Sequence, residues 1–205
     1  SKLKTFYCSG NQLTSMNVTG TKLLSNIFYC YSNTPAGIDI FVDNVLAANA
    51  LPDSLWKKDP ASVYTYCQSG LNTTWDGASW DNGAPTSSTA AIISGNYSEA
   101  ADINACTLTI NNNAIVTIPT GFKVTLNAPV TVEAGSSFTL SNDTNLIQTN
   151  KRSINSGAVT VKRNSNALKR LDYTLWSSPV SGAQTLADFS PLTTQSPSRF
   201  YTFDT

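Results

Sequence analysis

The side chains best suited to chemistry lie in one stretch, WDGASWDNGAP, at residues 75–85. Trp75 and Trp80 each precede an aspartate, and Gly, Asn and Pro mark the stretch as a series of turns. An exposed indole ring can stack on a sugar ring, so both tryptophans are candidate glycan-binding residues. Indole rings also cover the open ends of β-structures, and we favour that structural role here.

Two other aromatic residues, Tyr97 and Trp176, complete the set of candidate glycan-binding residues. The carboxylates in the same turns, Asp76 and Asp81, are the available candidates for holding Ca²⁺. They lack the D-x-D-x-D-G spacing of a calcium loop, so we predict neither a metal site nor a cofactor.

Histidine is absent from all 205 residues. This absence removes Ser-His-Asp and Cys-His catalytic centres and every His-ligated metal site from the chain. Lysine plus arginine balances aspartate plus glutamate at 13 each, so a basic field for nucleic acid is not expected. We therefore predict no catalytic residues, and no catalytic activity of the chain's own.

The elements that position these residues are expected to be short strands. Charged residues make up 13% of the chain, and Asn, Ser and Thr supply the polarity instead. Uncharged polar residues with frequent β-branching suit strands and turns, so the fold is predicted to be mainly β. No apolar run approaches the roughly 18 residues of a membrane span, so membrane insertion is not expected. The opening at Ser1 suggests a chain processed or excised from something longer.

A leucine-rich-repeat pattern occupies residues 3–13, LKTFYCSGNQL, and recurs 22 residues later in a degraded form. A second, degraded copy is typical of the end of an array, where a cap covers the core. The pattern places Phe6, Cys8, Leu13, Phe28 and Cys30 in that core. A Cys8–Cys30 disulfide is one alternative, and two free buried thiols are the alternative that we favour.

Residues 107–140 repeat an apolar–Thr–apolar triplet whose central threonines are spaced 8, 8, 6 and 8 positions apart. Alternation directs the flanking residues to the core and threonine to the outside. This predicts a short β-solenoid, with an antiparallel β-sandwich as the alternative. The outward threonines could contact ice or polysaccharide, but β propensity alone explains them, and the interval of 6 suggests a broken register. The predicted core residues are Leu108, Ile110, Val116, Ile118, Val124, Leu126, Val132 and Leu140.

The predicted domains follow these patterns. Residues 1–67 are the end of a leucine-rich-repeat array with its C-terminal cap, and residues 68–73 are a polar linker. Residues 74–149 form the β-solenoid-like module. Residues 150–205 are an incomplete β-rich module that resembles the start of a β-sandwich.

Several stretches resemble modules of large secreted proteins of Bacteroidota, particularly flavobacteria. FYCSGNQLTSMNV resembles their leucine-rich repeats, and TWDGASWDNGAPTSSTAAIISGNY resembles their β-solenoid module. DYTLWSSPVSGAQTLADFSP resembles the module that usually follows it. The resemblance implies an extracellular or cell-surface location and export by the type IX secretion system, whose machinery would be a transient partner. It also makes Ser54, within Asp53-Ser54-Leu55, a candidate for O-glycosylation.

These observations favour a non-catalytic surface or adhesin-type module that binds a glycan or another surface protein, or that spaces parts of a larger secreted protein. The first alternative is a passive stalk, or secretion cargo without a ligand of its own. The second is an accessory part of a carbohydrate-active enzyme. A glycosidase needs a pair of carboxylates, and scattered acids such as Glu133 have no evident partner, so the catalytic residues of such an enzyme would lie outside this chain.

Overall fold

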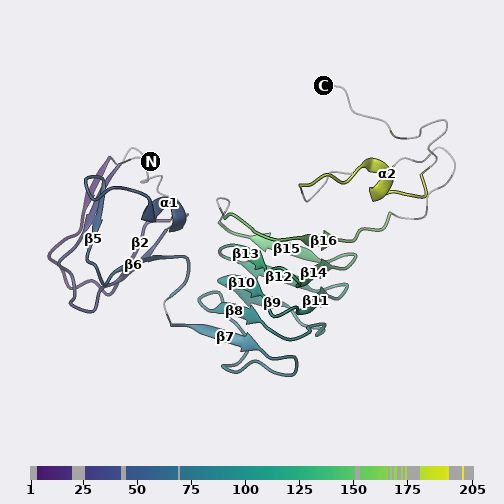
Figure 1. Ribbon diagram of the computed structural model, residues 1–205, viewed down its shortest axis with the longest axis horizontal. Coiled ribbons are helices and arrows are strands. Elements are labelled where there is room, and N and C mark those ends of the chain that lie inside the picture. Colours follow the sequence, from purple (N-terminus) through teal and green to yellow (C-terminus); the bar gives the residue numbers. More distant parts are fainter. Residues whose placement is uncertain are drawn as a thin grey trace. The chain divides into compact units, whose positions relative to one another are not determined.

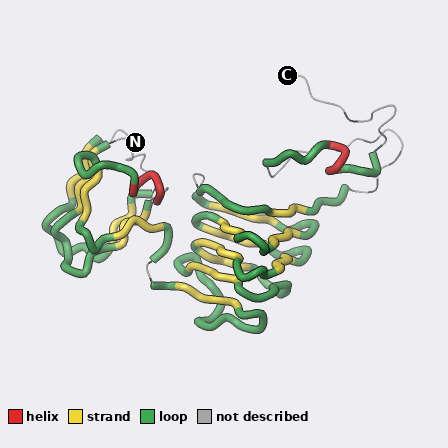
Figure 2. Tube along the Cα trace, in the orientation of Figure 1, coloured by secondary structure: helices red, strands yellow, loops and turns green. Residues whose placement is uncertain are grey.

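The computed structural model describes residues 4–19, 26–42, 45–68, 70–150, 153–165, 167, 169, 172, 174, 181–193 and 200. The chain forms two compact units, residues 1–164 and residues 165–205, and each is considered by itself. The first unit is mainly β and contains a β-solenoid (Figure 1). Strands and loops make up nearly all of the described chain, and helices contribute very little (Figure 2).

Residues 5–65, here called the N-terminal coil, form two parallel sheets. Each turn of the coil adds one strand to both sheets. The first sheet contains β1 (Thr5–Tyr7), β3 (Ile27–Cys30) and β5 (Trp56–Lys58). The second contains β2 (Ser15–Asn17), β4 (Asp39–Phe41) and β6 (Val63–Thr65), and the short helix α1 (Val45–Asn49) contacts β6.

The core of the N-terminal coil is a stack of aromatic rings from successive turns. Phe6 pairs with Phe28 and Phe28 with Trp56, with ring centroids 5.9 Å and 4.8 Å apart. The predicted burial of Cys8, Phe28 and Cys30 is confirmed. Phe6 and Leu13 are only half-buried, contrary to prediction: Phe6 lies in β1, an edge strand of its sheet, and Leu13 lies just before β2, an edge strand of the other.

Residues 72–161, here called the three-sheet stack, form the β-solenoid. One sheet contains β7 (Asn72–Trp75), β8 (Ala90–Ile93), β10 (Thr107–Ile110) and β13 (Val130–Val132). The second contains β9 (Ile103–Ala105), β12 (Lys123–Leu126) and β15 (Asn145–Gln148), and the third β11 (Ile115–Ile118), β14 (Ser137–Leu140) and β16 (Val159–Val161). Every pairing between these strands is parallel, which excludes the antiparallel sandwich.

Alternation within each strand determines which side chains enter the core. In β10, β11, β12 and β14 every second residue is buried, and the residues between them face outward. The chain turns sharply at the corners between strands, where Asn112 and Asn113 adopt φ values of 55° and 58°. The predicted core is confirmed for all of its members: Leu108, Ile110, Val116, Ile118, Val124, Leu126, Val132 and Leu140.

The repeated threonines face outward as predicted, but they form separate ladders on different faces. Thr117, Thr139 and Thr160 pair in one sheet, whereas Thr109 pairs with Thr131 in another. Leu108 pairs with Val130, so one turn spans 22 residues at this level. The intervals of 8, 8 and 6 are the three sides of one turn, and the expectation of a broken register was wrong.

The stack extends beyond its predicted boundaries at both ends. Strand β7 begins at Asn72, inside the predicted linker. Strand β16 pairs with β14 and so adds residues 159–161 to the solenoid. In the second unit the structure describes helix α2 (Leu186–Phe189), which begins with a capping box between Thr185 and Asp188. The rest of the predicted sandwich-like module lies largely outside the described residues.

Among the described residues, no helix has the length and apolarity required to cross a membrane.

Strand β11 offers a matched pair of isoleucines that tests the assignment of its two faces. Ile118 has none of its surface exposed, whereas Ile115 is 59% exposed. We expect Ile118→Ala to lower the free energy of unfolding by about 2–5 kcal/mol, because it leaves a cavity between turns. Ile115→Ala should change it by less than about 0.5 kcal/mol. Urea denaturation followed by circular dichroism measures both, and equal losses would contradict the assignment.

Candidate functional site

The predicted glycan-binding aromatics form a cluster at the β7 end of the three-sheet stack. Trp75 lies at the end of β7, the edge strand of its sheet, and its ring centroid is 5.6 Å from that of Trp80 and 5.1 Å from that of Tyr97. The Trp75 Nε1 donates a hydrogen bond to the Asn96 carbonyl at 2.9 Å. The exposed fractions of Trp75 and Tyr97 are 6% and 3%.

This burial leaves no broad aromatic face for a sugar at Trp75 or Tyr97. Trp80 is half-buried against both rings, so the cluster covers the first turn of the stack. The burial of Trp75 agrees with the structural role that we favoured, and sugar binding at Trp80 stays a prediction. Trp176, the fourth candidate, lies outside the described residues.

The two aspartates of the same region hold the turns together. The Asp76 carboxylate accepts hydrogen bonds from the Ser79 and Ala78 backbone N–H groups at 2.9 and 2.8 Å. Asp81 accepts one from the Thr74 N–H at 2.7 Å. These backbone hydrogen bonds lower the pKa of both carboxyls below the ordinary value of 3.8. No cluster of metal-ligating side chains occurs among the described residues.

Ser54 lies exposed in the turn before β5. Its carbonyl accepts a hydrogen bond from the Tyr29 hydroxyl at 2.9 Å, which anchors the backbone of the turn. The position is accessible to a modifying enzyme, and O-glycosylation of Ser54 remains a prediction.

The four cysteines divide into a buried free pair and a disulfide. Cys8 and Cys30 are free thiols in the core of the N-terminal coil. Cys67 and Cys106 form a disulfide, with their Cα atoms 5.7 Å apart. This bond was not predicted. The signal was present in the sequence: once the repeat pattern assigns Cys8 and Cys30 to one core, Cys67 and Cys106 are the remaining pair.

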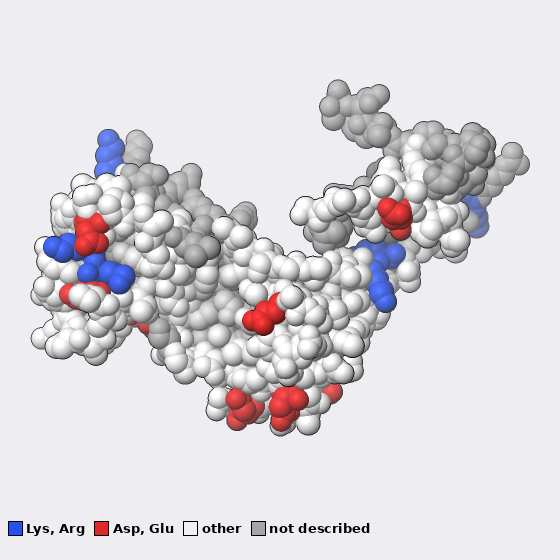
Figure 3. Space-filling view, viewed as in Figure 1, with Lys and Arg blue, Asp and Glu red and all other residues white. Residues whose placement is uncertain are grey.

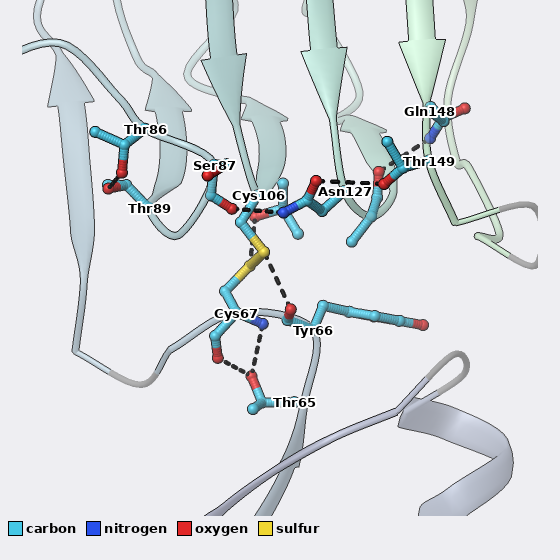
Figure 4. Close-up of a disulfide and its surroundings, with 12 residues drawn as sticks. Thr65, Tyr66, Cys67, Thr86, Ser87, Thr89, Cys106, Asn127, Gln148 and Thr149 are labelled. Carbon is cyan, nitrogen blue, oxygen red and sulfur yellow. Dashed lines mark hydrogen bonds between the residues drawn. A yellow bond between two sulfur atoms is a disulfide. The ribbon is translucent and has the colours of Figure 1, made fainter. Parts of the chain in front are cut away.

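A cleft of about 600 Å³ opens beside this disulfide. Both cysteines contribute to its wall, and the Cys106 Sγ lies 3.1 Å from the Tyr66 carbonyl oxygen (Figure 4). Phe41, Val42, Tyr66 and Ala128 are its apolar lining residues besides the two cysteines. The side-chain amides in its lining are those of Asn17, Gln68, Asn127 and Asn150.

One wall of the cleft carries a chain of side-chain hydrogen bonds that crosses successive turns of the stack. We name Ser87, Asn127 and Thr149 the corner rail. The Thr149 hydroxyl donates to the Asn127 Oδ1 at 3.3 Å, and the Asn127 Nδ2 donates to the Ser87 carbonyl at 2.7 Å (Figure 4). The main chain supports this arrangement, since the Asn150 N–H donates to the Asn127 carbonyl at 3.2 Å.

No charged residue is among the described residues that line the cleft. Charged side chains are also sparse on the described surface in the view of Figure 3. In the described part of the chain the one ion pair joins Lys123 to Asp102 at 3.5 Å on an exposed face of the stack. Sequence reasoning missed the cleft because its lining comes from segments far apart in the chain.

The thiols give a direct test of the cysteine assignment. Desolvation raises the pKa of both Cys8 and Cys30, so little thiolate forms in the folded chain even at mildly alkaline pH. We expect a thiol reagent to label neither cysteine in the native protein and both after denaturation. Reduction before labelling should raise the number from 2 to 4.

The double variant Cys8→Ser/Cys30→Ser is the control, and without reductant it should show no labelling in denaturant. Rapid labelling of the native wild-type chain, or four labels without reduction, would contradict the assignment.

The lowered pKa values of Asp76 and Asp81 predict how the stability of the fold depends on pH. Both residues lie in residues 75–85, here called the tryptophan loop. A carboxyl whose pKa is lower in the folded than in the unfolded chain stabilises the fold above its ordinary pKa of 3.8. That contribution is lost as the pH falls through the folded-state value. Asp81→Asn should therefore be less stable than wild type at neutral pH, with a smaller loss on acidification. Thermal melts from neutral to acid pH measure this, and stabilisation by added Ca²⁺ would show instead that the aspartates bind metal.

The comparisons with known proteins place the stack within a family. A family model described as Domain of unknown function (DUF8693) matches residues 67–205. No curated protein matches the chain, and no solved structure does. The matched range includes both cysteines of the disulfide, the aromatic cluster and all three sheets of the stack. Because it covers more than half of the sequence, the chain belongs to the DUF8693 family.

Proposed function

We propose that the chain is a non-catalytic extracellular module that binds surface ligands for a larger secreted protein. The observation that carries the proposal is the chemistry of the stack's outside. Its ladders and its corner rail present hydroxyl and amide groups on a backbone held in place by continuous parallel pairing. Such a surface offers many hydrogen-bond donors and acceptors at fixed spacing, which suits recognition of an extended polar ligand.

The disulfide supports the extracellular location. Disulfides persist in oxidising compartments and are rare in the reducing cytosol. The Cys67–Cys106 bond therefore agrees with the extracellular location that the resemblance to secreted proteins of Bacteroidota implies. Export by the type IX secretion system is part of the same proposal.

We infer that the N-terminal coil is the end of a leucine-rich array, with residues 37–67 as its cap. Two contacts support this assignment. Cys8 and Cys30 follow the paired residues Tyr7 and Tyr29, 22 positions apart. The Asn11 Nδ2 donates to the Cys8 and Ser9 carbonyls at 3.0 and 3.2 Å, as the repeat asparagine does where the coil turns.

The placement of the acids supports a binding role over a catalytic one. Hydrolysis needs an acid or base poised near the working pH, and histidine is absent from the sequence. Asp76 and Asp81 have pKa values shifted further from neutrality by their backbone hydrogen bonds. These two carboxyls therefore stay ionised at neutral pH and do not serve as proton donors there.

The proposal is tested by exposing the full chain to printed arrays of neutral and acidic glycans and of extracellular matrix proteins. We expect saturable retention on at least one of these surfaces, without release of soluble sugar into the supernatant. The denatured and alkylated chain is the control for nonspecific adhesion. Retention on none of the surfaces would leave only a passive stalk or secretion cargo, and release of sugar by this chain alone would make it an enzyme.

A further inference from the structure

We propose that the cleft beside the Cys67–Cys106 disulfide is a binding site for a neutral oligosaccharide. This inference rests on the proposed binding function and adds the location and the chemical class of the ligand. It places the ligand away from the tryptophan loop, where burial leaves no room to stack a sugar on Trp75.

The absence of charge from the described lining determines the first property of the ligand. A charged ligand entering the cleft would lose hydration without gaining an ionic partner among the described lining residues, which is costly in a partly enclosed site. An uncharged ligand avoids this cost. Its binding should therefore respond little to ionic strength.

Unpartnered polar groups determine the second property. The Ser88 hydroxyl and the Gln68 side-chain amide line the cleft, and neither makes a hydrogen bond within the described part of the chain. Covering such groups with an apolar ligand would cost about 1–3 kcal/mol for each one left unsatisfied. The ligand must therefore both donate and accept hydrogen bonds, as sugar hydroxyls do.

The geometry of the wall favours binding without rearrangement. The corner rail fixes the Asn127 amide and the Thr149 hydroxyl before any ligand arrives, which reduces the entropy lost on binding. The lining also includes the apolar residues Phe41, Val42, Tyr66 and Ala128, and apolar surface of this kind suits the C–H face of a sugar ring. The volume of about 600 Å³ lies within the usual range of small-ligand sites.

Calorimetric titration of the full chain tests the site. The probes are the neutral hexasaccharides of glucose, mannose, xylose and N-acetylglucosamine, with hexagalacturonate as the acidic counterpart and an uncharged Ser/Asn-rich peptide as the non-sugar counterpart. We expect at least one neutral hexasaccharide to bind with a dissociation constant on the order of 10 μM to 1 mM. Its affinity should be the same in low and high salt.

Two variants locate the binding. Ser88→Trp fills the cleft from an exposed turn and should weaken binding at least about tenfold, and Gln68→Ala should weaken it by several-fold because it removes unpartnered donors and acceptors. Ser98→Trp adds the same side chain at an exposed position outside the cleft and should leave the affinity unchanged. Circular dichroism and melting temperature verify that all three variants fold.

The outcomes separate this site from the proposed function. Retention on a surface array together with unchanged sugar affinity in Ser88→Trp would overturn the cleft assignment and leave the binding module intact. Preference for hexagalacturonate or for the peptide would overturn the ligand class. If no neutral hexasaccharide binds the wild-type chain, the inference fails, whatever the arrays show.

Discussion

In-register parallel pairing between successive turns is the constraint on which the rest of this structure depends. A single turn of the stack is a ring of short strands that cannot bury its own inward side chains. Stacking places Val116 on Phe138 and Phe138 on Val159, and so closes the core one turn at a time. The same in-register pairing aligns the outward side chains into ladders. The packing of the core therefore also determines where the surface groups lie.

Stacking also leaves one end of the apolar core open, and aromatic residues cover that end. Trp75, Trp80 and Tyr97 occupy the β7 end of the stack, where an apolar interior would otherwise meet water. The cleft proposed as a binding site lies instead at a corner of the stack. There the side chains are free of the alternation that sets the faces of the sheets, and polar groups such as Asn127 gather next to the disulfide.

The strands and their buried faces could be predicted from the sequence because alternation is local: the residues around Thr117 or Thr125 alone determine which face is buried. The three-sided shape of each turn could not be deduced in this way. The interval of 6 can be interpreted as the third side of a turn only once Leu108 is known to pair with Val130. The cleft could not be predicted from the sequence for the same reason. Its lining joins Asn17 to Asn150, and no local pattern connects them. The burial of Trp75 could not be predicted either, because it depends on residues that are distant in the sequence.

The Cys67–Cys106 disulfide gives the chain a mechanical property. A pulling force transmitted along the backbone would pass from Cys67 to Cys106 through the sulfur atoms and bypass the segment between them. That segment holds β7, β8 and β9 together with the aromatic cluster. With 39 residues of sequence separation, about 130 Å of contour length stays locked under tension. Under tension, the beginning of the stack is then the part that stretching cannot extend.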